Sequence, residues 1–123
     1  MKKLKFLLIG RDETTFDNLQ RALVESGQHS VSRVSMPEQV YKVITDSKID
    51  AVIVDEAVEG ATGLEFVREL VRRNPFVNCA LVSSLYPQEF HEATEGYGVF
   101  MQLPAQPGQK QAREMCAHLQ KIC

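Results

Sequence analysis

The sequence predicts an α/β protein built on a doubly wound, five-stranded parallel sheet. Two observations carry this prediction. Short apolar runs rich in β-branched residues alternate with longer segments whose apolar residues recur at helical spacing. The connections between them are short, which favours right-handed crossovers from each strand to the next. The chain has 123 residues without an internal repeat or linker, so we expect a single domain over residues 1–123.

Five apolar runs are predicted to be strands. The clearest is the third, which is β-branched and almost free of charge, as is typical of strands buried on both faces of a parallel sheet. The second is shorter and shows only a loose alternation of apolar and polar residues. The predicted strands are residues 5–9, 29–34, 50–54, 78–82 and 99–103, and we expect the flavodoxin-like order 2-1-3-4-5 across the sheet.

Five helices are predicted, one after each strand. Asp12 is the candidate N-cap of the first, since its carboxylate can accept a free backbone N–H, and Gly27 ends that helix. Pro37 opens the second helix, the third ends near residue 74, and the fourth spans residues 87–95 with a weak apolar pattern. The last spans residues 108–122. The residues predicted to face inward from the first and last helices are Phe16, Leu19, Leu23, Val24, Ala112, Met115, Cys116, Leu119 and Ile122.

The composition disfavours several classes of function. A net charge of −2 leaves no surplus of lysine and arginine, so we expect no nucleic-acid partner. No segment approaches the roughly 18 apolar residues of a membrane span, so we expect no membrane partner. The lysines near the start precede an apolar run too short for a signal peptide. The three cysteines lack CxxC spacing, which argues against zinc or a disulfide frame and favours a cytoplasmic location. Cys79 lies in an apolar run, so we expect it to be buried.

The histidines do not form a metal or catalytic motif. His29, His91 and His118 lack the spacing of a metal site and are expected at the surface. None of them is placed to activate Ser83 or Ser84, so a catalytic triad is not expected. The loop after the first strand also lacks the glycine-rich fingerprint of a dinucleotide site. We therefore expect a protein that is not an enzyme and that has no catalytic residue, metal ligand set or cofactor.

Asp55 is the strongest candidate for a functional residue. It directly follows the third strand, and a glycine-containing loop of residues 56–63 then leads into a new helix. Open α/β sheets bind their ligands in the crevice outside the carboxyl ends of the strands. By position alone, the acid either belongs to such a site or caps the loop.

Taken together, these features resemble the response-regulator receiver domain, the phosphoacceptor module of two-component signalling. The resemblance covers essentially the whole chain, and residues 50–65 match the family pattern without a gap. It implies that Asp55 accepts phosphoryl from a histidine kinase and that the Ser83 hydroxyl holds a phosphoryl oxygen and turns inward on activation. It also implies that Phe100 is the aromatic residue that swaps rotamers. Pro104 matches the family proline, which usually follows a cis peptide bond.

The same resemblance exposes departures from the family pattern. Receivers carry two adjacent acids after the first strand, which hold Mg²⁺, and these positions are Gly10 and Arg11 here. The lysine before the family proline is replaced by Leu103. Asp12, one position further on, is expected to act as a cap rather than as a metal ligand. Phosphoryl transfer relies on cations to offset negative charge, so we expect a degenerate receiver that binds Mg²⁺ only if the altered pocket still holds it.

Two interpretations of Arg11 remain open at this point. It is either a solvated residue of a surface loop, or its guanidinium folds over Asp55 and takes the place of the absent metal. An arginine–carboxylate pair of that kind would be strong and permanently charged, and it would lock the pocket in one state.

Three hypotheses of function follow. The first is a stand-alone receiver-like module of two-component signal transduction that acts through protein contacts, with weak or absent Mg²⁺-dependent phosphorylation. The second is a phosphoaccepting response regulator, and the third is a small flavodoxin-like ligand-binding protein. The expected partners are other signalling proteins, such as a histidine kinase or a downstream effector. A homodimer face would involve the fourth helix, the fifth strand and the fifth helix, including Phe90, Tyr97, Phe100 and Met101.

Overall fold

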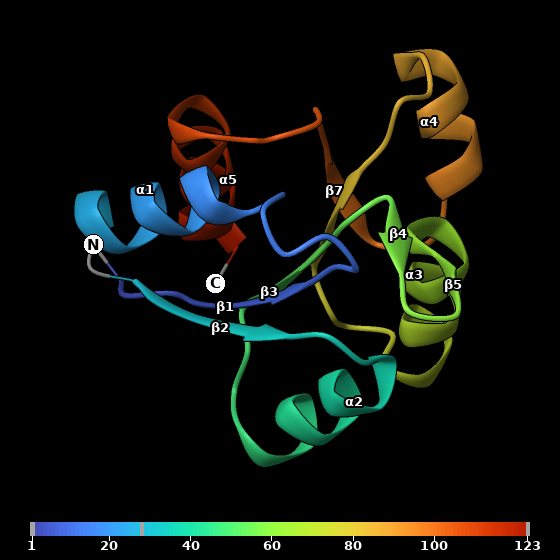
Figure 1. Cartoon of the computed structure of the whole chain (residues 1–123), viewed down its shortest axis with the longest axis horizontal. Coiled ribbons are helices and arrows are strands. Elements are labelled where there is room, and N and C mark those ends of the chain that lie inside the picture. Colours follow the sequence, from blue (N-terminus) through green and yellow to red (C-terminus); the bar gives the residue numbers. More distant parts are fainter. Residues whose placement is uncertain (1, 28, 123) are drawn as a thin grey trace.

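The computed structural model describes residues 2–27 and 29–122. The elements in Figure 1 are β1 (Lys5–Ile9), α1 (Asp17–Gly27), β2 (Ser30–Val34), α2 (Pro37–Asp46), β3 (Ala51–Val54), β4 (Ala57–Val58), β5 (Ala61–Thr62), α3 (Gly63–Arg73), β6 (Cys79–Val82), α4 (Pro87–Thr94), β7 (Val99–Leu103) and α5 (Gln109–Ile122). No helix within this part of the chain is long and apolar enough to cross a membrane.

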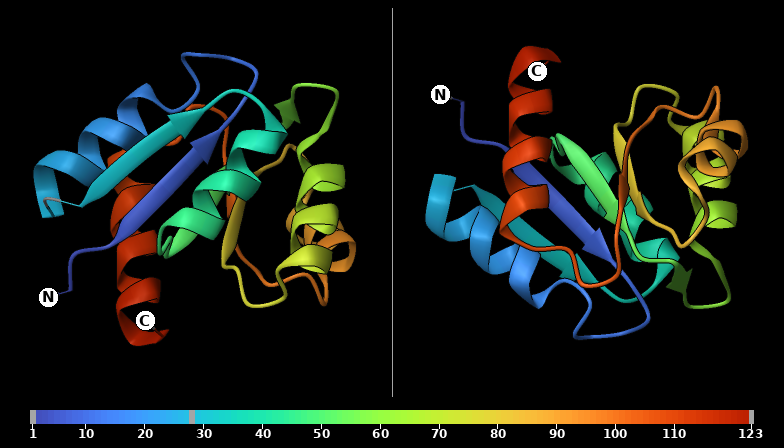
Figure 2. Two further views of the ribbon diagram at one scale, coloured as in Figure 1. Left: turned by 90° about the horizontal axis from the view of Figure 1, so that it is seen from below. Right: turned by 90° about the horizontal axis from the view of Figure 1, so that it is seen from above.

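The main sheet is parallel and runs in the order β2-β1-β3-β6-β7. Helices α1 and α5 cover one face, and α2 and α3 cover the other, with α4 beside α3 (Figure 2). Since β6 and β7 are the fourth and fifth strands of this sheet, the predicted order 2-1-3-4-5 is confirmed. The predicted fold class, a doubly wound five-stranded parallel sheet, is confirmed with it.

Strand β3 shows why the sheet is covered on both faces. Its residues 51–54 are completely buried and alternate between two apolar clusters. Ile53 packs in the cluster below α1 and α5, whereas Val52 and Val54 pack in the cluster below α2 and α3. Successive side chains of a strand point to opposite faces, so a strand in the middle of a doubly covered sheet must be apolar throughout.

The loop after β3 forms a short antiparallel hairpin that was not predicted. Strand β4 pairs with β5 around Gly60, whose φ of 82° favours glycine. Thr62 then caps α3, because its hydroxyl accepts the Glu65 N–H at 3.1 Å while the Glu65 carboxylate accepts the Thr62 N–H at 3.0 Å. Gly63, the first residue of α3, has no room for a side chain because its Cα faces the Asp55 carbonyl. The hairpin therefore brings the start of α3 against the end of β3.

Three details of the predicted helices are wrong. Helix α1 begins at Asp17, and the carboxylate of Asp12 accepts the Thr14 N–H at 2.9 Å and the Thr14 hydroxyl at 2.8 Å, which closes a turn ahead of the helix. These hydrogen bonds lower the pKa of Asp12. Val24 and Ile122, predicted to face inward, are 45% and 55% exposed, because both lie at the margin of their apolar stripe.

His29 is buried, and the prediction that it lies at the surface is wrong. Its Nδ1 accepts the Leu4 N–H at 2.9 Å, and its ring meets the ring of Phe6 edge-on at 5.8 Å between centroids. The packing became possible because the neighbouring Gly27 has no side chain to collide with the imidazole. The other two histidines, His91 and His118, are exposed as predicted.

Cys79 is buried as predicted, and burial raises the pKa of its thiol to about 12. Cys116 is half-buried, and Cys123 lies outside the described residues.

The environment of His29 predicts a pH-dependent stability. Burial lowers the pKa of His29 below its ordinary value of 6.5, while the nearby Asp50 carboxylate acts in the opposite direction. Between the lowered pKa and 6.5, the unfolded chain binds more protons than the folded one. The neutral imidazole therefore makes its full contribution to the free energy of unfolding above pH 6.5. This contribution is lost as the pH falls through the pKa of His29 in the folded protein, because a protonated Nδ1 no longer accepts the Leu4 N–H.

Urea unfolding between about pH 5 and pH 8 measures this effect. We expect His29→Gln to flatten the dependence of the unfolding free energy on pH in this range. The matched variant His118→Gln, on an exposed histidine, should keep the slope of the parent protein. An unchanged slope in His29→Gln would show that His29 does not control it.

Candidate functional site

Asp55 lies at the carboxyl end of β3, where it is only 7% exposed. Its backbone N–H donates to the Ile9 carbonyl at 2.9 Å, which continues the pairing of β3 with β1 by one residue. Its carboxylate oxygen Oδ1 accepts the Glu56 N–H at 2.7 Å. The acid therefore occupies the predicted place in the sheet and also caps the first turn of the following loop.

Gly10 packs directly against the Asp55 side chain. A Cβ added at Gly10 would lie 2.8 Å from Asp55 Cβ and 2.9 Å from Asp55 Oδ2. The first of these distances involves an atom close to the backbone, so a larger residue at position 10 requires Asp55 itself to shift. The structure thus brings Gly10 and Asp55 together, as the sequence pattern predicts, but in a contact that suits glycine.

Arg11 does not pair with Asp55, and the locked-pocket interpretation is wrong. The ion pairs among the described residues do not include one between Arg11 and Asp55. Arg11 is exposed, and its backbone N–H donates to the Ala57 carbonyl at 3.0 Å, which ties the loop after β1 to the hairpin after β3. A solvated guanidinium keeps its hydration at no cost in side-chain ordering, and that is the alternative the structure supports.

Ser83 ends the neighbouring strand, as predicted. Its backbone N–H donates to the Leu103 carbonyl at 3.1 Å, and its hydroxyl accepts the Leu85 N–H at 3.1 Å. Ser83 and Glu56 line a cavity of about 220 Å³ whose apolar wall includes Leu81 and Phe90. The predicted hydroxyl is therefore at the correct strand end, where it supports the turn into α4.

Glu56 is the residue that the sequence prediction missed. Its carboxylate oxygen Oε2 accepts the Ser84 N–H at 2.7 Å and the Ser84 hydroxyl at 2.9 Å. These two residues are 28 positions apart in the chain. The only sequence signal was the position of Glu56 directly after Asp55, and nothing in the pattern indicated that it reaches a second loop.

Strand β7 supplies the remaining predicted residues. Phe100 is half-buried and stacks on His118 of α5 with 4.8 Å between ring centroids. Leu103 is completely buried in the cluster that also contains Leu8 and Ile53. Pro104 is exposed, and the expected cis bond before it is absent, since no peptide bond in residues 2–27 and 29–122 is cis.

The residues present do not form an evident metal site. In the described part of the chain, no group of three or more His, Cys, Asp or Glu side chains is placed to hold a metal ion. Asp12, the acid nearest the position of the missing pair, is exposed and uses its carboxylate for Thr14.

The fold of this chain was compared with those of known proteins. No family model matches the sequence, and no curated protein matches it. The chemotaxis response regulator CheY4 of Vibrio cholerae superposes with a TM-score of 0.78 at 14% identity, over 96% of this chain and 99% of that one. The chain has the fold of a response-regulator receiver domain.

Two further solved structures agree with this receiver fold. The signal receiver domain of an HD domain-containing protein from Pseudomonas fluorescens gives a TM-score of 0.79 at 12% identity, over 98% of this chain and 89% of that one. A CheY-like receiver domain protein from Methanospirillum hungatei gives 0.78 at 12% identity, over 98% of this chain and 96% of that one. At these identities the likeness concerns the fold, and the role of each site residue has to be argued from its own contacts.

Proposed function

We propose that this protein is a receiver-like module of two-component signal transduction that acts through protein contacts, with weak or absent Mg²⁺-dependent phosphorylation at Asp55. The observation that carries the proposal is the contact between Gly10 and Asp55. In a receiver fold this position would carry an acid that holds the metal, whereas here the glycine leaves no carboxylate and lies against the Asp55 side chain.

Charge and burial around Asp55 support the same proposal. Mg²⁺ requires near-octahedral oxygen coordination, usually with one or two carboxylates beside its water ligands. Asp55 is almost fully buried, and one of its oxygens is already engaged by Glu56. With Gly10 and Arg11 in place of the acids, the residues present do not fit a Mg²⁺ site of the receiver type.

Leu103 supports the proposal from the other side of the pocket. The lysine that would stand here in a receiver offsets charge on the phosphoryl group, and cations of this kind carry most of the catalysis of phosphoryl transfer. Leu103 is buried in the apolar core, so its side chain contributes packing and no charge. We infer that the module is a signalling protein and not an enzyme.

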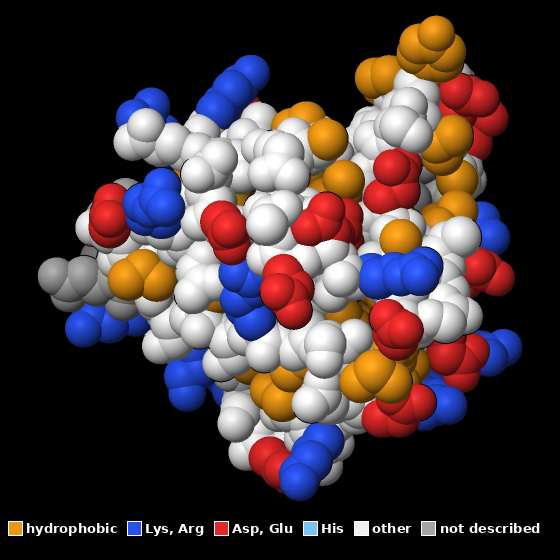
Figure 3. Space-filling view, in the orientation of Figure 1, with side chains coloured by type: hydrophobic (Ala, Val, Ile, Leu, Met, Phe, Trp, Pro, Cys, Tyr) orange, Lys and Arg blue, Asp and Glu red, His pale blue; other side chains and the backbone are white. Residues whose placement is uncertain are grey.

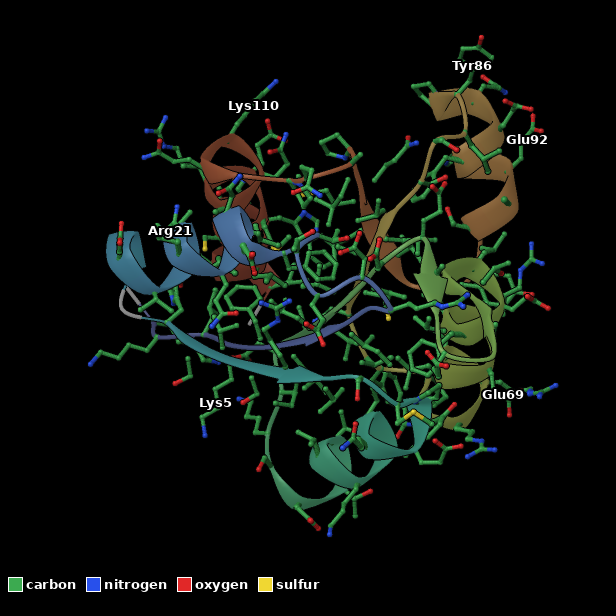
Figure 4. The ribbon with its side chains drawn as sticks, viewed as in Figure 1. Lys5, Arg21, Glu69, Tyr86, Glu92 and Lys110 are labelled. Atoms are coloured by element: carbon green, nitrogen blue, oxygen red, sulfur yellow. The ribbon has the colours of Figure 1, made fainter. Side chains whose placement is uncertain are left out.

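The proposed contact surface lies at α4 and the loop before it. Leu85 and Tyr86 are 38% and 77% exposed, and Tyr86 points into solvent at the tip of α4 (Figure 4). Figure 3 shows this tip projecting from the body of the molecule with hydrophobic side chains at its end. Of the predicted contact residues, Phe90 is buried and unavailable, while Tyr97 is half-buried and lies just before β7, at the opposite end of the strands from Tyr86.

Capture from a lysate of the source organism tests this function. The immobilised protein is expected to retain a signalling partner or a second copy of itself, and Tyr86→Ser should reduce that capture because it removes the most exposed aromatic of the proposed surface. Phe76→Ser is the matched control, since Phe76 is 97% exposed but lies before β6, at the opposite end of the strands. Equal loss in both variants, or no loss in Tyr86→Ser, would contradict the assignment of this surface.

A further inference from the structure

Residues 83–86 connect β6 to α4, and the first three of them, 83–85, are held by side chains from two other elements. Glu56, in the loop after β3, accepts two hydrogen bonds from Ser84 on a single carboxylate oxygen, at 2.7 Å from the backbone nitrogen and 2.9 Å from the hydroxyl. A carboxylate acceptor makes hydrogen bonds of this kind stronger than those between neutral groups.

Gln102 of β7 holds the same loop from the other side. Its Nε2 donates to the Ser83 carbonyl at 3.1 Å and to the Leu85 carbonyl at 2.7 Å. The Glu56 carboxylate thus accepts hydrogen bonds from Ser84, and the Gln102 amide donates to the carbonyls of the residues on either side of it. We call Glu56, Gln102 and residues 83–85 the loop clamp.

The loop clamp matters because apolar burial holds α4 only weakly. Within α4 only Phe90 and Thr94 are buried. The hydroxyl of Thr94 donates to the Phe90 carbonyl of the same helix at 2.8 Å, so it does not bind α4 to another element. The exposed tip, Leu85 and Tyr86, lies within and next to the clamped segment. Its position is therefore set largely by the hydrogen bonds of the loop.

Asp55 positions the acid of the clamp. Its Oδ1 accepts the Glu56 N–H at 2.7 Å, which orients the backbone from which the Glu56 side chain reaches Ser84. In this arrangement the chain uses an aspartate at the strand end to support a neighbouring glutamate.

We propose that the Glu56 carboxylate is an internal anion that holds the loop of residues 83–85 in one conformation without modification of Asp55. The N–H and the hydroxyl of Ser84 both donate to this carboxylate, so one side chain fixes the backbone and the side chain of the same loop residue. This inference rests on the proposed function in one respect, namely that a partner binds the tip formed by Leu85 and Tyr86. The clamp makes that surface constant, so the signal would depend on the amount or location of the protein.

Amide hydrogen exchange followed by NMR tests the clamp directly. In Glu56→Ala, exchange at the Ser84 amide should become about tenfold faster, because a charge-assisted hydrogen bond is lost. Ser84→Ala, which removes only the hydroxyl, should keep the backbone bond to Glu56 and give a smaller increase. Glu59→Ala is the matched control, since Glu59 is an exposed acid in the same hairpin.

The Val52 amide is the internal reference for unfolding of the whole domain, because it donates to the Asn78 carbonyl within the sheet at 2.9 Å. The proposal requires faster exchange at Ser84 with unchanged exchange at Val52. Unchanged exchange at Ser84 in Glu56→Ala would overturn the proposal, and so would equal acceleration at both amides. The experiment needs no partner, so a failure of the capture experiment would refute the proposed function and leave the clamp standing.

Discussion

Replacing Leu103 by lysine is expected to destabilise the protein by more than about 3 kcal/mol. Leu103 is completely buried in the cluster below α1 and α5, among Leu8, Ile53 and Val82. An ammonium group at this place loses hydration, because Leu103 is completely buried among apolar side chains. Urea unfolding of Leu103→Lys and of the control Leu103→Met measures the effect, and the control should cost less than about 1.5 kcal/mol.

The result shows whether position 103, where receivers carry a lysine, still has room for that side chain. A large loss in Leu103→Lys alone means that the pocket has been closed by core packing. A loss below about 1 kcal/mol would mean that the lysine side chain extends past the strand end to a polar environment, and would contradict the expectation drawn from the burial of Leu103.

Ile53→Ala is expected to cost about 2–5 kcal/mol, through lost burial and the cavity left behind. Ile53 is completely buried at the centre of β3, with β1 and β6 paired on either side. Val24→Ala on α1 is the control, since Val24 is 45% exposed and its truncation should change stability by only about 0.5 kcal/mol. Chemical denaturation gives both values. Similar small losses for the two variants would contradict the central place of β3 in the core.

The strands and their order were predictable because the signal for them is local. Each buried strand is short and apolar throughout, and parallel pairing with crossover helices leaves few possible orders for five such strands. Burial of Val52, Ile53 and Val54, expected for a strand covered on both faces, is confirmed. Asp55 was predictable as a site candidate for the same reason, since it ends the clearest strand.

Two of the errors concern contacts between residues far apart in the chain. His29 is buried because its ring finds the Leu4 N–H, 25 positions away, and a lone histidine in a sequence carries no sign of such a partner. Glu56 and Ser84 are likewise 28 positions apart. The sequence could not decide between the two interpretations of Arg11, because they differ only in the direction of its side chain, toward solvent or over Asp55. The structure decides between them, because Arg11 is exposed and the ion pairs of the described residues do not join it to Asp55.

In the proposed function, Asp55 at the end of β3 has a structural role and accepts phosphoryl with the help of Mg²⁺ weakly or not at all. Intact mass spectrometry after incubation with Mg²⁺ and a small acyl phosphate tests it most directly. A receiver domain that carries the acidic pair serves as the positive control for the donor. We expect the control to gain the mass of a phosphoryl group in most of its molecules, while this protein and its Asp55→Asn variant both gain little or none. A phosphoryl adduct on this protein as abundant as that of the control, and absent from Asp55→Asn, would contradict the proposed function and establish a phosphoaccepting regulator.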